Sequence, residues 1–330
     1  MYSIEHYSVI RKYVFESPQD LELKLNELGS PCEFLVLEKG SFKAFLIIRL
    51  RHGIIDELRL KFNKRVMITG DKPQDKIRIS YCILDAFSEN DFPLVLGETL
   101  RPHSIAGFGN NTETSCILPA GVTSVHYGLP KSKLQKYAKQ KGYDSFLELC
   151  EKTNSIELHQ TQSILLRNCL QNILSNNILA VHGIEDLLKI LKRDQKVKPI
   201  KIRTRYRVAH EFLRWCHHHT TGEPPHLEEI SKDLFVSRRT LIQSVQENFQ
   251  RGPAEIHKMI RLQHCNHLLM KAKKEGTKDN FIGSNSVNDI MHIHGFRHRG
   301  AFAQSFKKQF GYMPSAALNP KKVGVEHLDN

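Results

Sequence analysis

Between Glu33 and Tyr127 the chain alternates short apolar runs with glycine, proline and asparagine turns. Runs of this length and spacing predict the strands of a β-sandwich or a small barrel. The predicted strands are Glu33–Leu37, Phe42–Leu50, Ile54–Phe62, Val66–Thr69, Ile77–Leu84, Leu94–Glu98, Ser104–Phe108, Thr114–Ile117 and Thr123–Tyr127.

The apolar period becomes helical between Leu129 and Leu191. Apolar residues recur there at steps of three and four, which predicts one amphipathic helix, and Ile184–Leu191 predicts a second. Two interpretations are open: the helices pack on their own β-domain, or they pair with a second copy of the chain. In the second case the dimerisation residues are Ile164, Leu165, Cys169 and Ile173.

A charged stretch from Lys192 to Pro199 has the composition of an exposed linker, and the period is helical from Ile202 to Leu318. We therefore predict an α+β fold with several domains. The divisions are a β-domain over residues 1–129, a helical segment over 130–192, a linker over 193–202, a helical domain over 203–320 and a tail over 321–330.

Residues 226–249 have the pattern of two short helices joined by a tight turn. Ser237 is placed to cap the second helix through its hydroxyl. The inward residues are Leu227, Ile230, Leu234, Val236, Leu241, Val245 and Phe249, and the outward ones are Arg238, Arg239, Ile242, Gln243 and Gln246. This arrangement is the helix-turn-helix plan, in which the second helix reads the major groove.

The same design recurs over residues 286–310, with Ser286 as the cap and Gly295 at the turn. Glycine there predicts a positive φ. The inward residues are Val287, Ile290, Ile293, Phe296, Phe302, Phe306 and Phe310, and the outward ones are Arg297, His298, Arg299, Ala303, Gln304, Lys307 and Lys308. A long helix over Pro253–Leu269 is expected to connect the two units, so that both enter successive major grooves.

These residues resemble the AraC/XylS family of regulators over roughly residues 203–320. The family pattern of the second unit is matched by Ile290, Gly295, Phe296, Phe302, Phe306, Lys307, Gly311, Pro314 and Ser315, and that of the first by residues 236–241, Pro253, Arg261 and Leu262. Within the family, V-S-R-R-T-L is similar to the ethanolamine-utilisation regulators. Phe235 stands where glycine is usual, and Gly300 and Gln304 replace the usual Ser and Arg.

The resemblance implies a transcription regulator, expected to be an activator and a homodimer that binds double-stranded DNA and contacts RNA polymerase. It also implies a cupin-like sensor domain over residues 1–129 that takes a small-molecule or protein effector, or only dimerises. The sequence names no effector-binding residues. The alternative of a DNA-targeted repair enzyme calls for a reactive or zinc-bound cysteine, and no such motif is present.

Charge agrees with a polyanionic partner. Residues 201–330 hold 21 Lys and Arg against 12 Asp and Glu, a net charge of +9, while residues 1–200 hold 27 against 23, a net charge of +4. Neutralising phosphates releases condensed counterions and so favours binding.

Arginine and glutamine side chains make the bidentate contacts that distinguish base edges. The residues expected to face bases are Arg239, Ile242, Gln243, Arg297, His298, Arg299 and Gln304. The residues expected to contact phosphate are Arg238, Thr240, Ser286, Lys307 and Lys308.

Other chemistry is disfavoured. Adjacent residues of the run Cys216–His219 point about 100° apart on a helix, so they converge poorly on a metal ion. His292, His294 and His298 are expected to approach DNA instead. The seven cysteines form no CxxC pair, which fits reduced thiols in a cytoplasmic protein. We expect no catalytic residue, no cofactor, no metal and no membrane span.

Overall fold

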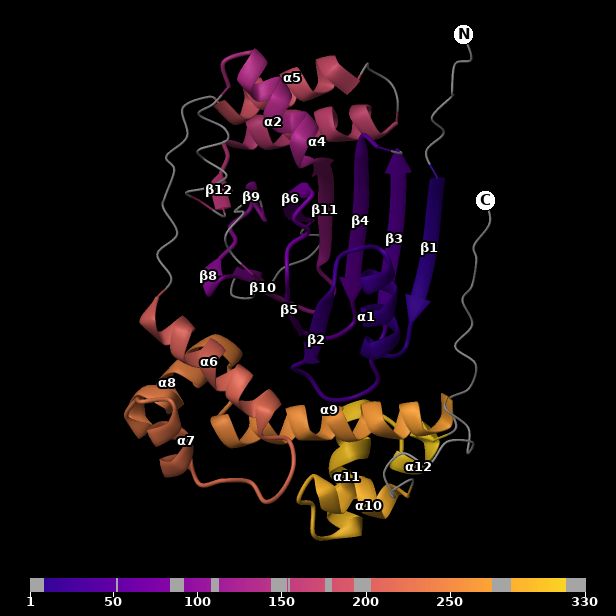
Figure 1. Ribbon diagram of the computed structural model, residues 1–330, viewed down its shortest axis with the longest axis vertical. Coiled ribbons are helices and arrows are strands. Elements are labelled where there is room, and N and C mark those ends of the chain that lie inside the picture. Colours follow the sequence, from indigo (N-terminus) through magenta and orange to yellow (C-terminus); the bar gives the residue numbers. More distant parts are fainter. Residues whose placement is uncertain are drawn as a thin grey trace. The chain divides into compact units, whose positions relative to one another are not determined.

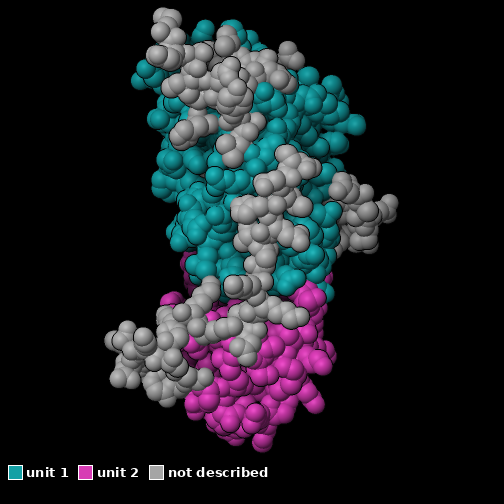
Figure 2. Space-filling model, turned by 90° about the vertical axis from the view of Figure 1, so that its right-hand side faces the viewer, with its two compact units in different colours: residues 1–34, 43–201, 324–330 teal, residues 35–42, 202–323 magenta. Residues whose placement is uncertain are grey.

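The computed structural model describes residues 9–51, 53–83, 92–107, 113–143, 153, 155–175, 180–192, 203–274 and 286–318. The chain divides into two compact units (Figure 2). Unit 1 comprises residues 1–34, 43–201 and 324–330, and unit 2 comprises residues 35–42 and 202–323. The expected linker over 193–202 and the expected tail over 321–330 lie outside the described residues.

The described strands form two sheets (Figure 1). One sheet has seven strands in the order β1-β3-β4-β11-β6-β9-β12, and the other has five in the order β2-β5-β10-β7-β8. The strands are β1 (Val9–Phe15), β2 (Cys32–Val36), β3 (Ala44–Arg51), β4 (Ile55–Phe62), β5 (Val66–Gly70), β6 (Lys76–Ile83), β7 (Leu94–Val95), β8 (Glu98–Thr99), β9 (Ser104–Ala106), β10 (Thr114–Leu118), β11 (Thr123–Pro130) and β12 (Ser155–Glu157).

The strand expectations from Glu33 to Tyr127 agree with these bounds, except that one predicted strand is divided. Residues 94–98 contain β7 and the start of β8, which are antiparallel partners. The turn between them has positive φ at Leu96 (+51°) and Gly97 (+76°). A left-handed pair reverses the chain, so the continuous strand expected there is wrong.

The helices of unit 1 are α1 (Pro18–Glu27), α2 (Lys131–Gln140), α4 (Gln160–Leu174) and α5 (Ala180–Lys192). Helix α1 and strand β1 were not anticipated from the sequence. The start of α1 nevertheless has local signals: Ser17 accepts a hydrogen bond from the Asp20 amide at 3.4 Å, and Pro18 occupies the first turn.

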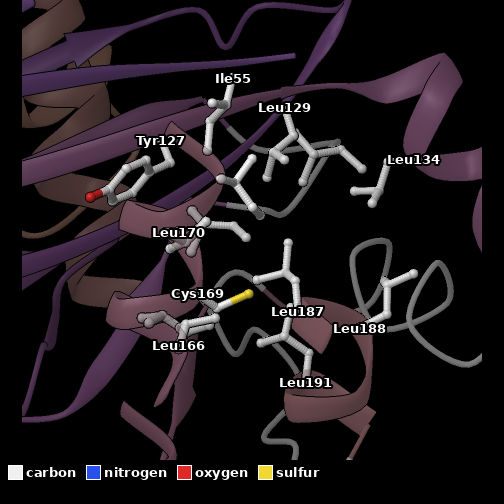
Figure 3. Close-up of a cluster of buried hydrophobic side chains, with 14 of the residues drawn as sticks. Ile55, Tyr127, Leu129, Leu134, Leu166, Cys169, Leu170, Leu187, Leu188 and Leu191 are labelled. Atoms are coloured by element: carbon white, nitrogen blue, oxygen red, sulfur yellow. The ribbon is translucent and has the colours of Figure 1, made fainter. Parts of the chain in front are cut away.

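In the central strands of the seven-stranded sheet, alternate residues face two different interiors. On β11, Val125, Tyr127 and Leu129 enter a core shared with α2, α4 and α5, in which Figure 3 labels Tyr127 and Leu129. Leu170 of α4 lies in the same core as these three residues. His126, between Val125 and Tyr127 in sequence, lines a cavity within the β-domain. The sheet therefore separates two interiors, one against the helices and one within the β-domain.

The predicted stripe on α4 is divided by the structure. Cys169 is 8% exposed and Ile173 fully buried in the core of unit 1, whereas Ile164 and Leu165 are 50% and 47% exposed. The buried face of α4 is centred on Leu166, Leu170 and Leu174, and at about 100° per residue Ile164 and Leu165 lie outside it. The first interpretation, packing on the chain's own β-domain, is correct for Cys169 and Ile173.

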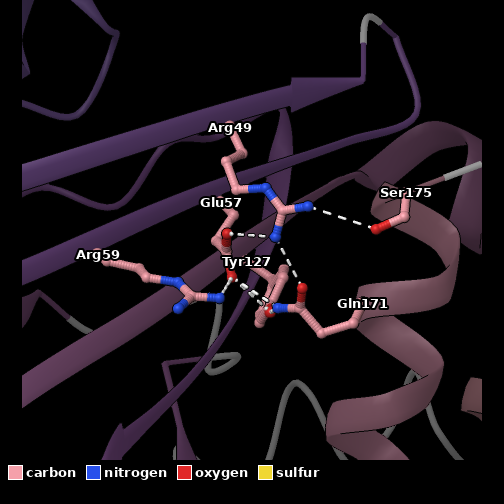
Figure 4. A network of polar contacts seen from close by, with 6 residues as sticks. All are labelled: Arg49, Glu57, Arg59, Tyr127, Gln171 and Ser175. Atoms are coloured by element: carbon pink, nitrogen blue, oxygen red, sulfur yellow. Dashed lines mark hydrogen bonds and ion pairs between the residues drawn. The ribbon is translucent and has the colours of Figure 1, made fainter. Parts of the chain in front are cut away.

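A polar network fastens α4 to the sheet (Figure 4). Glu57 is fully buried, and its carboxylate accepts hydrogen bonds from Arg59 (2.8 Å), Tyr127 (2.6 Å) and Gln171 of α4 (2.8 Å). Arg49 donates to Gln171 at 2.7 Å and pairs with Glu57 at 3.4 Å. Burial alone would raise the pKa of Glu57, but the bonds from Arg59 and Tyr127 hold it below its usual value.

The helices of unit 2 are α6 (Thr204–His218), α7 (Leu227–Asp233), α8 (Arg238–Phe249), α9 (Pro253–Lys274), α10 (Val287–Ile293), α11 (Arg299–Phe310) and α12 (Pro314–Ala317). Helix α9 contacts α6, α8, α10, α11 and α12. Its 22 residues correspond to about 33 Å of helix. Among the described residues, no helix has both the length and the apolar character needed to cross a membrane.

Replacing Glu57 by alanine should lower the free energy of unfolding by about 3–5 kcal/mol, because Arg59 would keep a partly buried charge without its partner. Urea unfolding followed by circular dichroism measures this loss. The matched control is Glu27→Ala, which removes an exposed ion pair with Lys24 and should cost less than about 1 kcal/mol. Equal losses in the two variants would contradict a structural role for the network.

Candidate nucleic-acid interface

Helices α7 and α8 form the first helix-turn-helix unit, and Ser237 caps α8 as predicted. The Ser237 hydroxyl accepts a hydrogen bond from the Thr240 amide at 3.0 Å, which caps α8. Glu229 accepts a bond from the His226 amide at 3.3 Å at the start of α7. Trp215 of α6 donates to Asp233 at 3.0 Å and so fixes the end of α7.

The inner face of the first unit is largely the predicted one. Ile230, Leu241, Val245 and Phe249 are buried, while Leu227, Leu234 and Val236 are half-buried. The outer face of α8 exposes Arg238, Arg239 and Gln246, and Ile242 is 40% exposed. Gln243 is half-buried.

The turn of the first unit holds Phe235 at φ +53°, with its side chain 95% exposed. The Phe235 amide donates to Lys232 O at 3.0 Å, and the Val236 amide donates to Ser231 O at 3.0 Å. This hydrogen-bonding pattern closes the helix end with one left-handed residue, the position that glycine occupies without steric cost. Phenylalanine adopts this left-handed conformation only with steric strain at its Cβ.

Helices α10 and α11 form the second unit. Gly295 has the expected positive φ, +67°, and a Cβ there would collide with the carbonyl of Gly222. Phe302, Phe306 and Phe310 are buried at successive four-residue steps, with ring centroids 5.6 Å and 4.7 Å apart. This aromatic stripe packs on α9 residues Leu262, Cys265 and Leu269.

Two inward and outward assignments in the second unit are wrong. Ile293 was expected to be buried and is 42% exposed, while His294 was expected to approach DNA and is 2% exposed. His294 donates from Nδ1 to the carbonyl of Thr220 at 2.6 Å. That long-range bond draws residue 294 inward, and Met291, which is 1% exposed, fills the space assigned to Ile293.

Three of the predicted interface side chains, those of Arg238, Arg297 and Thr240, are engaged within unit 2. Arg238 pairs with Glu228 at 2.5 Å, and Arg297 pairs with Glu223, which lowers the pKa of the Glu223 carboxyl. The Thr240 hydroxyl shares a hydrogen bond of 2.8 Å with Ser237. These pairs are exposed, so each costs little to exchange for a phosphate.

Ser286 caps α10 by accepting from the Asp289 amide at 3.1 Å, and its hydroxyl donates to the Asp289 carboxylate at 2.6 Å. The hydroxyl proton is committed to that carboxylate. A negative side chain in the first turn of a helix repels an anion, so the phosphate contact expected for Ser286 is disfavoured.

The remaining predicted residues lie on the exposed surface of unit 2. Arg239 is the second residue of α8 and Arg299 the first residue of α11. Both are exposed, and neither forms an ion pair with another residue in the described part of the chain. The other exposed residues of this set are His298, Gln304, Lys307 and Lys308.

The structure gives no support to a metal site. Among the described residues, no group of three or more His, Cys, Asp or Glu side chains is arranged to hold a metal ion. Cys216 is fully buried in α6, and burial raises the pKa of its thiol. His219 instead stacks on Trp215 with ring centroids 4.0 Å apart.

Residues 230–319 match a protein-family model described as a helix-turn-helix domain. The match spans α8 and α11 with the helices between them. The chain contains a helix-turn-helix domain. Such domains bind double-stranded DNA through the second helix of each unit.

Several solved structures are similar to the chain. The AraC-like transcriptional activator CuxR is 14% identical, with 78% of this chain and 94% of that chain covered and a TM-score of 0.35. ToxT from Vibrio cholerae O395 bound to (E)-4-(8-methylnaphthalen-1-yl)but-3-enoic acid is 10% identical, with 94% and 98% covered and a TM-score of 0.31. The C-terminal domain of AraT, a response regulator from Geobacillus stearothermophilus, is 17% identical, with 37% and 92% covered and a TM-score of 0.29. No curated protein matches the chain.

The two turns give opposite expectations for stability. Phe235→Gly should raise the free energy of unfolding by about 0.5–1 kcal/mol, because glycine relieves the left-handed strain and no buried surface is lost. Gly295→Ala, at the equivalent turn, should lower it by more than about 1 kcal/mol. Thermal unfolding of both variants measures the pair. A loss in both would mean that the Phe235 side chain makes a stabilising contact.

Proposed function

We propose that the chain is a sequence-specific transcription regulator that inserts α8 and α11 into successive major grooves of double-stranded DNA. The observation that carries this proposal is that each unit exposes an arginine, Arg239 or Arg299, in the first turn of its second helix, without an ion pair among the described residues. The first turn of a recognition helix is the part that contacts base edges.

The base contacts are assigned to Arg239, Ile242 and Gln243 in the first unit and to Arg299 and Gln304 in the second, with His298 beside them. Arg297 would have to leave Glu223 to join this set. Lys307 and Lys308 of α11 are exposed and are assigned to phosphate, together with Arg238 and Thr240. Helix α11 contains no acidic residue, which favours a polyanion along its whole outer face.

The finer assignments follow the resemblance to AraC/XylS regulators, including the ethanolamine-utilisation subgroup. They are an activating role, contact with RNA polymerase and a cupin-like unit 1. We further assign self-association to the exposed face of α4. Its support is the pair Ile164 and Leu165, about half exposed on a helix whose one charged residue, Arg167, lies over the Tyr81 ring at 4.5 Å.

Unit 1 is assigned the effector. A cavity of about 130 Å³ lies between its sheets and is lined by apolar residues such as Leu58, Leu60 and Ile68 and by charged residues, among them Lys72 and Arg78. His126 offers the cavity a neutral polar edge, because burial lowers its pKa to about 4 and its ring bonds Ser80 at 2.8 Å. These dimensions and this lining fit a small molecule with an apolar body and a polar or charged end.

Replacing Arg239 or Arg299 by alanine should weaken binding to a selected duplex by about 1–3 kcal/mol and relax selection at one base pair. Fluorescence anisotropy on the selected duplex and its single-base variants measures both effects. The control is Arg214→Ala on α6, where the side chain pairs with Glu211 and affinity should be unchanged. An equal loss on every sequence would assign the arginine to the DNA backbone instead.

An effector should raise the melting temperature of the full chain and change its DNA affinity in the same concentration range. Ala106→Leu should abolish the temperature shift, because Ala106 lines the cavity and a larger side chain fills it. Thermal-shift screening with small apolar acids, amines and alcohols tests this. A compound that stabilises the wild type and the Ala106→Leu variant equally would place its site elsewhere and leave unit 1 an assembly module.

A further inference from the structure

The loop between α6 and α7, residues 219–226, is bonded to the turn of the second helix-turn-helix unit. The Gly222 amide donates to Ile293 O at 2.8 Å, and His294 Nδ1 donates to Thr220 O at 2.6 Å. Glu223 pairs with Arg297 beyond the same turn. The segment that leads into the first unit is therefore held directly by the second.

Arg261 of α9 forms hydrogen bonds with both segments. Its Nη2 donates to Gly222 O at 2.6 Å and also to the carbonyl of His294, and its guanidinium lies 5.1 Å from the centroid of the Phe296 ring. Arg261 is 3% exposed, and no carboxylate pairs with it among the described residues. One buried cation thus bonds the loop of one unit and the turn of the other.

Protonation of His294 or His264 would place a second positive charge close to Arg261. The Nδ1 proton of His294 is used on Thr220, and its Nε2 is buried without a partner in the described residues. His264 lies between His217 and His294, with ring centroids 5.9 Å and 6.2 Å away. The charged and titratable groups that face this cluster are His217, His219 and Glu223 from α6 and its loop, His257, Arg261, Cys265 and His267 from α9, and Arg297 after the second turn.

Protonation therefore works against this arrangement. Burial, followed by His217, His294 and His267, lowers the pKa of His264 to about 4, and burial with Arg261 lowers the pKa of His294. A histidine with a lowered pKa stays neutral in the packed cluster but protonates once it is exposed to solvent. The stability that it contributes is therefore lost as pH falls below about 6.5. For His264 alone, release becomes about tenfold more favourable between about pH 7.5 and about pH 5.5.

We propose that Arg261 and His294, with loop 219–226, are positioning residues that hold the two recognition helices at one fixed spacing on DNA, and that they do so only while the histidines are uncharged. We call this set the clamp. The proposal rests on the proposed function, because it assigns to the clamp the spacing of two half-sites that α8 and α11 are to read.

The sign of the pH response distinguishes the clamp from general electrostatics. Acidification makes the chain as a whole more positive, and general attraction to phosphate strengthens binding at every sequence. Release of the clamp instead weakens selection for spacing while each unit keeps its own half-site.

The test uses the full chain and a duplex selected by it from a random-sequence library at about pH 7.5 and about 0.15 M salt. Affinity is then measured for that duplex, for duplexes with one or two base pairs inserted between the half-sites, and for each half-site alone. We expect insertions to cost about tenfold or more in affinity at about pH 7.5, and most of this penalty to disappear at about pH 5.5, with half-site affinity retained.

Two variants separate the clamp from a loss of folding. His294→Asn keeps a donor near Thr220 and cannot titrate, and His264→Gln removes the second titrating ring at a half-buried position. Either should retain more of the spacing penalty at about pH 5.5 than the wild type. The matched control is His218→Asn, an exposed histidine of α6 outside the cluster, which should keep the wild-type response.

The outcomes are distinguishable. An unchanged spacing penalty at both pH values, or variants that respond to acid as the wild type does, would overturn the clamp. If acid abolished both half-site binding and the near-ultraviolet circular dichroism signal, the clamp would also be overturned, because the unit would then be unfolding as a whole. A chain that selects no DNA at about pH 7.5 would contradict the proposed function itself.

Discussion

The packing of unit 2 depends on the buried guanidinium of Arg261, which forms no ion pair with a carboxylate among the described residues. Arg261 is buried, and the described residues offer it backbone carbonyls and an aromatic ring in place of an anion. Its Nη2 donates to the carbonyls of Gly222 and His294, and losing either bond would leave the buried cation less compensated, so both residues are held in place. Gly295 lacks a side chain for the same reason, since a Cβ would occupy the space in which Gly222 and Arg261 meet.

Unit 1 is organised around a sheet with two interiors. The residues of β4 that face the cavity, Leu58 and Leu60, alternate with Glu57 and Arg59, which face α4. Tyr127 and His126 divide in the same way on β11. Strands β4 and β11 thus separate a molecule in the cavity from the polar network that holds α4. A shift of either strand would therefore change the cavity and the network together.

The sequence was sufficient wherever the signal was local. Period-two alternation located β2 to β6 and β9 to β11, and the turn residue Gly295 and the stripe from Phe302 to Phe310 defined the second helix-turn-helix unit. It failed where structure depends on distant partners. Strand β1 exists through its pairing with β3, and His294 is buried by a bond to Thr220, 74 residues earlier in the chain. The α4 stripe failed for a different reason, because apolar residues occur on more than one side of this helix and the buried face is centred on Leu166 and Leu170.

Alternation on β11 also restricts how the chain can change over time. Substitutions can refill either interior separately, since Val125 and Tyr127 belong to one and His126 to the other. Insertion of a single residue, however, would exchange the two sets and place an imidazole against the helices and aromatic rings in the cavity. Length variation among descendants of this sequence should therefore accumulate in the loops, while strands β4, β6 and β11 diverge only by replacement.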